Sequence, residues 1–326
     1  MIDRRSFIGT SLAAAGVAAL PSTAFAHVIK PAYKMYDTHA HFYTDDVDIY
    51  PFNASTARYG PEIMVAKAMR HPQTPREVFE FWDEVGVAKG AGVQYSSTYR
   101  FDNRYLLDIS AQNPERIVPV VILDPLGADT PATLEKMAAE NRIAGVRFTG
   151  TEVNGEFVFL SDAAAPVWQA ADRLGLLIVL MPIAGNTPGA MEQVARHAAR
   201  YPNVNILLDH IGFPRPENLP GTWGLTPQHL ALADHDNVYY KYTTLLIEQL
   251  HAANVDEKPF LEHMVQTFGA DHLTWGSDIG NTPGSMFAWV QYALASASGL
   301  SEDDQKGLFW DTAEKIHVPG GRGAAR

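Results

Sequence analysis

Short apolar runs alternate with amphipathic stretches along most of this chain. Apolar runs bounded by turn residues indicate buried strands, and apolar repeats at helical spacing indicate helices. The pattern predicts eight strands, at residues 33–36, 88–95, 117–123, 144–149, 176–181, 204–209, 238–242 and 272–276. A threonine cap at Thr74, followed by Pro75 and Glu77, starts one helix. Further helices are expected at residues 103–112, 130–140, 163–174, 188–201, 227–233, 259–268, 287–298 and 301–316.

Strands that alternate with helices predict a parallel sheet whose strands are covered on both faces. Eight of them favour an α/β fold of one domain, a closed (β/α)8 TIM-like barrel, over an open doubly wound sheet. No glycine-rich phosphate loop follows the first strand, which argues against a dinucleotide-binding fold. Residues 42–73, rich in Tyr, Pro and Asn, are expected to form a loop over the site.

Residues 1–26 are interpreted as an export signal that is separate from the fold. Arg4 and Arg5 form a twin-arginine pattern, a short apolar run follows, and residues 24–26 offer a small-residue cleavage site. The apolar run is too short to cross a bilayer, which requires about 20 residues. The sequence therefore predicts a periplasmic barrel of residues 27–326 that has no membrane partner after cleavage.

Charge and composition exclude several classes of partner and chemistry. The net charge is −12, and loss of residues 1–26 makes it −13, because Asp3, Arg4 and Arg5 together carry one positive charge. So acidic a chain is not expected to bind nucleic acid. It has no cysteine, which excludes thiolate metal sites and cysteine nucleophiles. No Gly-x-Ser-x-Gly elbow is present either, which disfavours a serine hydrolase. Nothing in the sequence indicates an oligomeric state.

Ionisable side chains collect at the predicted strand ends, where the site of such a barrel lies. His39 and His41 follow the first strand and, being two residues apart, point to the same side. His210 ends the sixth strand and Asp278 follows the eighth. Their convergence predicts a catalytic site in which Asp278 is the general base and the three histidines polarise a carbonyl. Cationic side chains near the same rim are expected to bind an anionic substrate: Arg147, Lys241, Arg215 and Arg100.

Three motifs at these strand ends resemble the amidohydrolase superfamily. They are Asp-x-His-x-His at residues 37–41, Asp-His-x-Gly-x-Pro at 209–214 and Gly-Ser-Asp at 276–278. Further segments are similar to the branch that holds 2-pyrone-4,6-dicarboxylate lactonase and the sugar-acid lactonases: residues 113–118, 145–148, 201–203 and 237–241. The resemblance runs from about residue 35 to about residue 313. It implies a hydrolase that opens the ring of a small anionic lactone.

The expected metal requirement follows from a departure from that superfamily. Metal-dependent members commonly have a histidine at the end of strand five, where this chain has Met181. Arg147 stands at strand four in place of a bridging lysine, so a two-metal centre is not expected. The prediction is catalysis without a required metal. The alternative is one divalent cation such as zinc, held by His39, His41 and Asp278.

Other functions stay open at this point. The first is a metal-dependent decarboxylase of the same superfamily, and the second is a lactone isomerase in which no water attacks. The third is a periplasmic binding protein without catalysis, against which the retained histidines and Asp278 argue. The sequence does not identify which lactone would be the substrate.

Overall fold

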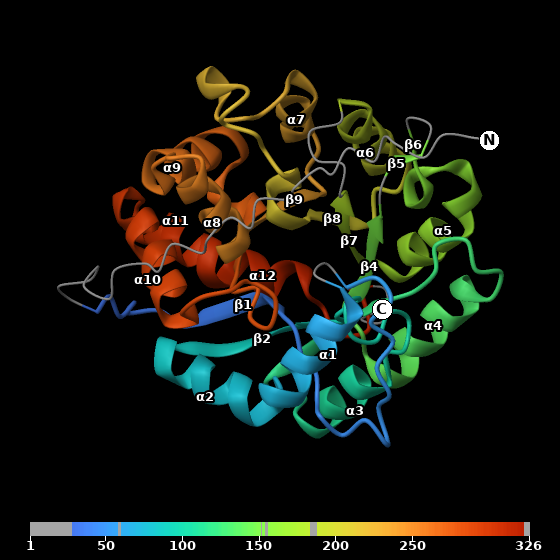
Figure 1. The fold of residues 1–326 in the computed structure, drawn as a ribbon. Helices are drawn as coiled ribbons and strands as arrows, with labels where there is room; N and C mark the ends of the chain where they lie inside the picture. Colours follow the sequence, from blue (N-terminus) through green and yellow to red (C-terminus); the bar gives the residue numbers. More distant parts are fainter. Residues whose placement is uncertain (1–27, 58–59, 151, 154–155, 183–187, 323–326) are drawn as a thin grey trace, which may run out of the picture.

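The computed structural model describes residues 28–57, 60–150, 152–153, 156–182 and 188–322. Its main sheet has eight strands in the order β1, β2, β3, β4, β7, β8, β9 and β10, and every registered neighbour pair is parallel. Helices surround these strands (Figure 1). The predicted (β/α)8 barrel is therefore confirmed. The predicted export signal lies outside the described residues and stays a prediction.

The eight strands lie close to their predicted positions. The first one begins two residues later than expected and continues through most of the His39 motif. Their bounds are β1 (Met35–Ala40), β2 (Val87–Val93), β3 (Ile117–Ile122), β4 (Gly145–Gly150), β7 (Leu177–Pro182), β8 (Asn205–Leu208), β9 (Val238–Thr243) and β10 (Leu273–Gly276). A two-stranded hairpin, β5 (Glu152–Val153) and β6 (Glu156–Phe157), follows β4.

Most helices were predicted from the sequence. They are α2 (Pro75–Val85), α3 (Arg104–Gln112), α4 (Thr130–Asn141), α5 (Ala165–Leu174), α6 (Pro188–Arg200), α7 (Pro227–Ala231), α9 (Glu257–Phe268), α10 (Met286–Ser296), α11 (Glu302–Lys306) and α12 (Thr312–Ile316). The last two are joined by a π-helical turn, Gly307–Asp311, in place of the single helix expected there.

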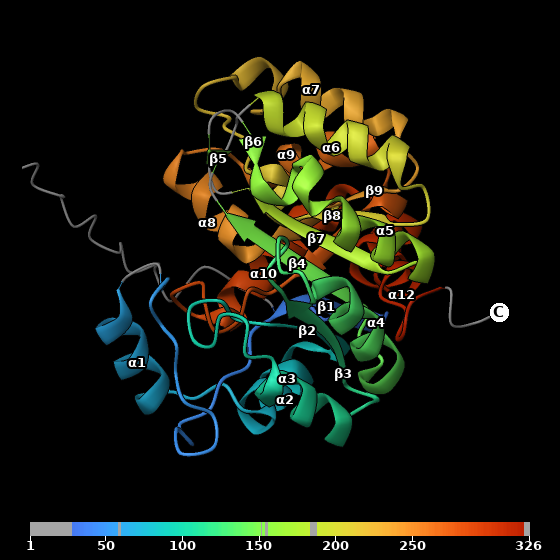
Figure 2. The ribbon, with the colours of Figure 1, turned by 90° about the vertical axis from the view of Figure 1, so that its right-hand side faces the viewer.

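Two helices were not predicted. The first, α1 (Pro61–Arg70), lies within the expected loop 42–73 and stands apart from the strands (Figure 2). Its cap is Gly60, without a side-chain hydrogen bond, and it buries only Met64 and Ala68, so its sequence signal is weak. The second, α8 (Thr244–Ala252), is largely buried, and its apolar residues therefore show no clear one-faced period.

The first and last strands meet in a seam directly below the strand ends that carry the motifs. Ala40 bridges Ile279, and the amide of His41 donates to the Ile279 carbonyl at 3.1 Å. The buried Asp37 carboxylate accepts from the Ser277 amide at 2.8 Å and from the Trp82 indole of α2 at 2.9 Å. Asp37 thus joins β1, β10 and α2, which holds the barrel shut next to the site.

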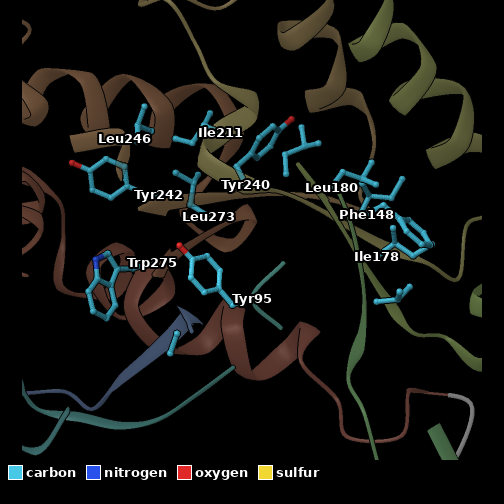
Figure 3. Close-up of a cluster of buried hydrophobic side chains, with 14 of the residues drawn as sticks. Tyr95, Phe148, Ile178, Leu180, Ile211, Tyr240, Tyr242, Leu246, Leu273 and Trp275 are labelled. Atoms are coloured by element: carbon cyan, nitrogen blue, oxygen red, sulfur yellow. The ribbon is translucent and has the colours of Figure 1, made fainter. Parts of the chain in front are cut away.

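Apolar side chains form two layers, one inside the barrel and one between strands and helices. The inner layer includes Val93, Val120, Val179 and Leu207. Figure 3 shows part of the outer layer, in which Phe148, Ile178 and Leu180 lie on one side and Tyr242, Leu273 and Trp275 on the other. Successive side chains of a strand point to opposite faces of the sheet, so neighbouring residues belong to different layers. Among the described residues, no helix is both long and apolar enough to cross a membrane.

Candidate active site

Four predicted residues meet at the C-terminal ends of the strands. His39 and His41 come from β1, His210 directly follows Asp209 after β8, and Asp278 follows β10 by two residues. The Nε2 atoms of His39 and His41 are 3.2 Å apart, and each lies 3.5 Å from Oδ1 of Asp278. All four side chains are at most 2% exposed. The structure therefore brings the four side chains together, as the sequence predicts.

The environment of His41 fixes where its proton lies. Its Nδ1 is 2.9 Å from the carbonyl oxygen of Val93. Because a carbonyl only accepts hydrogen bonds, Nδ1 carries the hydrogen and the neutral ring has a bare Nε2. This Nε2 faces the site, where it can accept a proton or bind a cation. It cannot donate to a substrate oxygen while the ring is neutral.

Asp278 presents one oxygen to its own loop and the other to the histidines. Oδ2 accepts from the Asn281 amide at 2.8 Å and from the Thr282 hydroxyl at 2.6 Å. Oδ1 is buried and has no hydrogen-bond partner among the described residues. Burial alone would raise the pKa of Asp278, but the three histidines around it, His41 foremost, lower it further than burial raises it. The carboxylate is therefore ionised at neutral pH, with one oxygen free.

These atoms fit a single divalent cation. The two Nε2 atoms and Oδ1 lie 3.2–3.5 Å from one another. Ligands about 2.1 Å from a tetrahedral zinc are about 3.4 Å apart, which matches that spacing. The unpartnered Oδ1 of Asp278 and the bare Nε2 of His41 are suitable donors. On donor type and spacing, the residues present fit a metal.

A second acid that sequence reasoning did not select, Asp209, lies under the site. Its carboxylate contacts Lys241 Nζ at 2.9 Å and Arg147 Nε at 2.8 Å, and all three groups are buried. Burial would raise the pKa of Asp209, but Lys241 and Arg147 hold it well below its ordinary value. The expected cationic rim is therefore partly wrong, because one buried acid faces two of its cations. The signal for Asp209 was its position directly before His210.

His39 lies between this buried ion pair and the other catalytic candidates. Its Nδ1 is 3.2 Å from Lys241 Nζ and 3.4 Å from Oδ1 of Asp209. Burial, and then the charge of Lys241, lower the pKa of His39 well below its ordinary value, so the ring is neutral at pH 7. The tautomer that donates to Asp209 carries its proton on Nδ1, whereas the tautomer that accepts from the Lys241 ammonium at Nδ1 carries its proton on Nε2. In the second tautomer the proton points at the bare Nε2 of His41.

His210 sits on an unusual backbone turn. Residues 210–213 all have positive φ, of 55°, 54°, 68° and 58°, and only Gly212 adopts this conformation without strain. Left-handed residues other than glycine cost about 1–2 kcal/mol each. Strain of this kind is concentrated at functional sites. The turn brings Nδ1 of His210 within 2.6 Å of the Thr243 hydroxyl, and burial lowers the pKa of His210 to about 4.

A buried histidine from α7 packs against this turn. Nε2 of His229 faces the Gly212 carbonyl at 3.4 Å, and its Nδ1 lies 2.9 Å from the Thr226 hydroxyl. A Cβ on Gly212 would approach that Nε2 to 3.2 Å. His229 therefore contacts the turn without lining the cavity next to it, and it was not among the residues selected from sequence.

A cavity of about 340 Å³ opens above these residues. His41, His210 and Asp278 form part of its wall, together with Arg147 and Arg215. Lys241 and Arg100, which were predicted to bind substrate, do not line it. Lys241 is fully buried against Asp209, and the guanidinium of Arg100 lies over the ring of Phe101 at 5.3 Å. Of the four predicted substrate-binding cations, Arg147 and Arg215 are thus in position.

Known proteins resemble this chain in sequence and in fold. The family model for amidohydrolases matches residues 36–317. L-fucono-1,5-lactonase from Burkholderia ambifaria is 27% identical over 244 residues, which span 74% of this chain and 79% of that protein. A crystal structure from Pseudomonas putida, assigned as a 2-pyrone-4,6-dicarboxylic acid hydrolase, has a TM-score of 0.68 at 23% identity and covers 89% of this chain and 98% of that one.

A further solved structure with the same fold contains zinc. An amidohydrolase from Burkholderia multivorans with bound zinc has a TM-score of 0.67 at 17% identity, and the match covers 88% of this chain and 100% of that one. At this identity the likeness concerns the fold. The family model, in contrast, spans nearly the whole barrel, including all four strand-end residues. The chain therefore belongs to the amidohydrolase family.

Proposed function

We propose that this protein is a lactone hydrolase in which Asp278 activates the attacking water. The observation that carries the proposal is the free Oδ1 of Asp278, which is buried between two histidines beside a cavity. The similarity to an L-fucono-1,5-lactonase supports the choice of lactone among amidohydrolase substrates. Lactone opening is the addition of water to a carbonyl, which needs a base and a stabilised oxyanion.

Different residues would serve the two needs. Asp278 accepts a proton from water at Oδ1 while Asn281 and Thr282 hold Oδ2. His210 stays neutral above pH 4. We propose the tautomer in which the Thr243 hydroxyl donates to Nδ1, so that the proton on Nε2 can donate to the developing oxyanion. While its ring is neutral, His41 has a bare Nε2, and in that form we propose that it polarises a carbonyl only through a bound cation.

A divalent cation, if the enzyme uses one, would be held by His39, His41 and Asp278. When bound, it would supply Lewis-acid polarisation of the lactone carbonyl or of water. His39 would then have to carry its proton on Nδ1, where Oδ1 of Asp209 lies 3.4 Å away as an acceptor. With the proton on Nε2, the same ring donates to His41 and no cation is needed to satisfy it. We propose the metal-free form as the working one.

The substrate class follows from the cavity wall. Two arginines line it. Arg147 forms an ion pair with Asp209, and the contact of Arg215 with Glu217 is longer, at 3.9 Å. Hydroxyl and amide side chains also line it: Thr56, Ser96, Ser97, Thr149, Gln249 and Asn281. Such groups bind hydroxyl substituents on a ring. We propose that the substrate is a hydroxylated lactone with at most one carboxylate, and that Arg215 binds this carboxylate.

The test is a panel of lactones assayed in water enriched in ¹⁸O. L-fucono-1,5-lactone, D-glucono-1,5-lactone and 2-pyrone-4,6-dicarboxylate represent neutral and dianionic rings. Hydrolysis places solvent oxygen in the carboxylate that forms, whereas isomerisation or decarboxylation incorporates none by that route. We expect labelled product from the sugar lactones. Unlabelled isomer, released carbon dioxide, or no turnover of any lactone would contradict the proposal.

A further inference from the structure

A second cavity, of about 370 Å³, lies next to the candidate active site. Arg215 and Gln249 line both cavities, so the two share a wall. Successive residues reach different sides of this wall: Phe213 and Leu245 line the first cavity, and Pro214 and Leu246 line the second. The second cavity is therefore adjacent to the site, and the shared wall includes two polar side chains, Arg215 and Gln249.

The lining of the second cavity is mainly apolar. Six of its residues are Pro214, Pro216, Leu246, Leu250, Ala252 and Ala253. Its two charged residues, Arg215 and Glu217, face each other at 3.9 Å and are 40% and 45% exposed. An exposed pair of this kind contributes at most about 1 kcal/mol and rearranges readily. The cavity therefore favours an uncharged, apolar occupant, and Arg215 and Gln249 remain available to the polar group that would join it to a ring.

Resting on the proposed function, we infer that the second cavity binds an apolar substituent of the lactone substrate. The ring lies against His210 and Asp278, and an alkyl or aryl group on it reaches past Arg215 and Gln249. Each cavity alone is at the lower end of the size range for small-molecule sites, about 300–1,000 Å³. The preferred substrate is accordingly larger than an unsubstituted monocyclic lactone.

δ-Hexalactone and δ-decalactone provide a matched pair of probes. Both are six-membered lactones, and they differ by four methylenes in the alkyl group on the ring. Each fully buried methylene contributes a factor of about four. We expect kcat/KM to be at least tenfold higher for δ-decalactone, because its chain is buried in the second cavity.

The blocking variant is Ala253→Trp, which fills the second cavity from a partly exposed position after α8. It should bring the ratio of the two kcat/KM values to near one while the value for δ-hexalactone stays within twofold. Ala139→Trp, at an exposed alanine of α4 outside both cavities, is the matched control and should keep the ratio. Equal kcat/KM for both lactones in the unmodified protein, or an unchanged ratio in Ala253→Trp, would overturn the inference.

A binding measurement separates this inference from the proposed function. Asp278→Asn protein, titrated calorimetrically with each lactone, should bind δ-decalactone at least tenfold more tightly, and addition of Ala253→Trp should remove the difference. Tighter binding of δ-decalactone without turnover of any lactone by the unmodified protein would contradict the proposed function and support the subsite. Turnover of lactones by the unmodified protein, together with equal affinities for the two lactones, would support the proposed function and contradict the subsite.

Discussion

At the scale of single residues, the proton on His39 decides between two ways in which this site can work. With Lys241 donating to Nδ1, a chain of donors runs from Lys241 through His39 and His41 to the Val93 carbonyl. With Asp209 accepting from Nδ1 instead, the Nε2 of His39 becomes a ligand. The two arrangements use the same atoms and differ in one tautomer. The buried Lys241–Asp209 pair is thus placed to bias the choice.

The first prediction concerns metal dependence. We expect protein treated with a chelator to keep its lactonase activity, because the chain of donors satisfies the histidines without a cation. Metal content is measured by mass spectrometry before and after chelation, alongside activity. Added zinc should bind once to the unmodified protein and not to His41→Ala. Loss of activity on chelation, with recovery on zinc addition, would contradict the metal-free form.

The second prediction concerns Asp278 as general base. Asp278→Asn keeps the shape of the side chain and removes its ability to accept a proton. We expect kcat to fall by roughly a hundredfold or more, with substrate binding still measurable by calorimetry. Asp83→Asn, at an exposed aspartate of α2, is the control and should leave kcat unchanged. Near-normal kcat in Asp278→Asn would move the base to His41.

The third prediction concerns Met181, the penultimate residue of β7, which stands where the sequence resemblance leads us to expect a histidine in a metal-dependent enzyme. Its sulfur accepts a hydrogen bond from Nη2 of Arg147 at 2.8 Å and lines the cavity. A thioether is a weak acceptor and Met181→Leu nearly conserves volume. We therefore expect kcat/KM to stay within a few-fold in steady-state assays. A fall in activity as large as that of Asp278→Asn would show that β7 contributes a catalytic side chain.

At the scale of elements, the left-handed turn of residues 210–213 positions the catalytic candidate His210 at a cost in backbone strain. Its strain persists only if neighbouring structure holds it. One part of that structure is His229, which contacts the Gly212 carbonyl from α7 while capping its own helix. Because His229 contacts this turn and does not line the active-site cavity, we expect it to be a positioning residue.

The fourth prediction tests that role. His229→Ala should lower kcat about tenfold with little change in KM, because His210 moves away from the oxyanion position while the cavity stays intact. His229→Gln, whose amide can still donate to Gly212, should restore most of kcat. His197→Ala is the control, since His197 is also buried and its Nδ1 bonds the Gln193 carbonyl within its own helix. Equal loss of kcat in His197→Ala and His229→Ala, tracking their melting temperatures, would rule out positioning.

Elements also show how far the sequence could lead. Strand positions and the four convergent residues were predictable, since buried runs and barrel topology determine where strand ends meet. The turn after β8 was not, because Ile211 and Phe213 have no preference for positive φ. The pairing of Asp209 with Arg147 and Lys241 could not be predicted either. The three residues belong to different strand segments, and the hydrophobic pattern does not show which of their side chains lie opposite each other.

At the scale of the whole molecule, several histidines are buried in their neutral form. Burial lowers the pKa of His229 to about 4, and burial followed by the charge of Lys241 lowers that of His317 to about 3. The two residues lie on different elements, α7 and the segment after α12, outside the candidate ligands. In the unfolded chain, histidine titrates near pH 6.5. The unfolded state therefore binds more protons than the folded state between about pH 6.5 and pH 4.

The fifth prediction follows from that difference. Because the unfolded state binds more protons, the free energy of unfolding rises with pH in this window and is lost as pH falls from 6.5 towards 4. Each such histidine contributes up to about 1.4 kcal/mol per pH unit where it is charged unfolded and neutral folded. Asp209 and Asp278, with lowered pKa values, act only below the ordinary carboxyl range. Urea unfolding at pH 7.0, 6.0 and 5.0 measures the slope. His317→Asn should be less stable than the unmodified protein at pH 7.0 and show a shallower slope, whereas an unchanged slope would mean that His317 takes up protons equally in the folded and unfolded states.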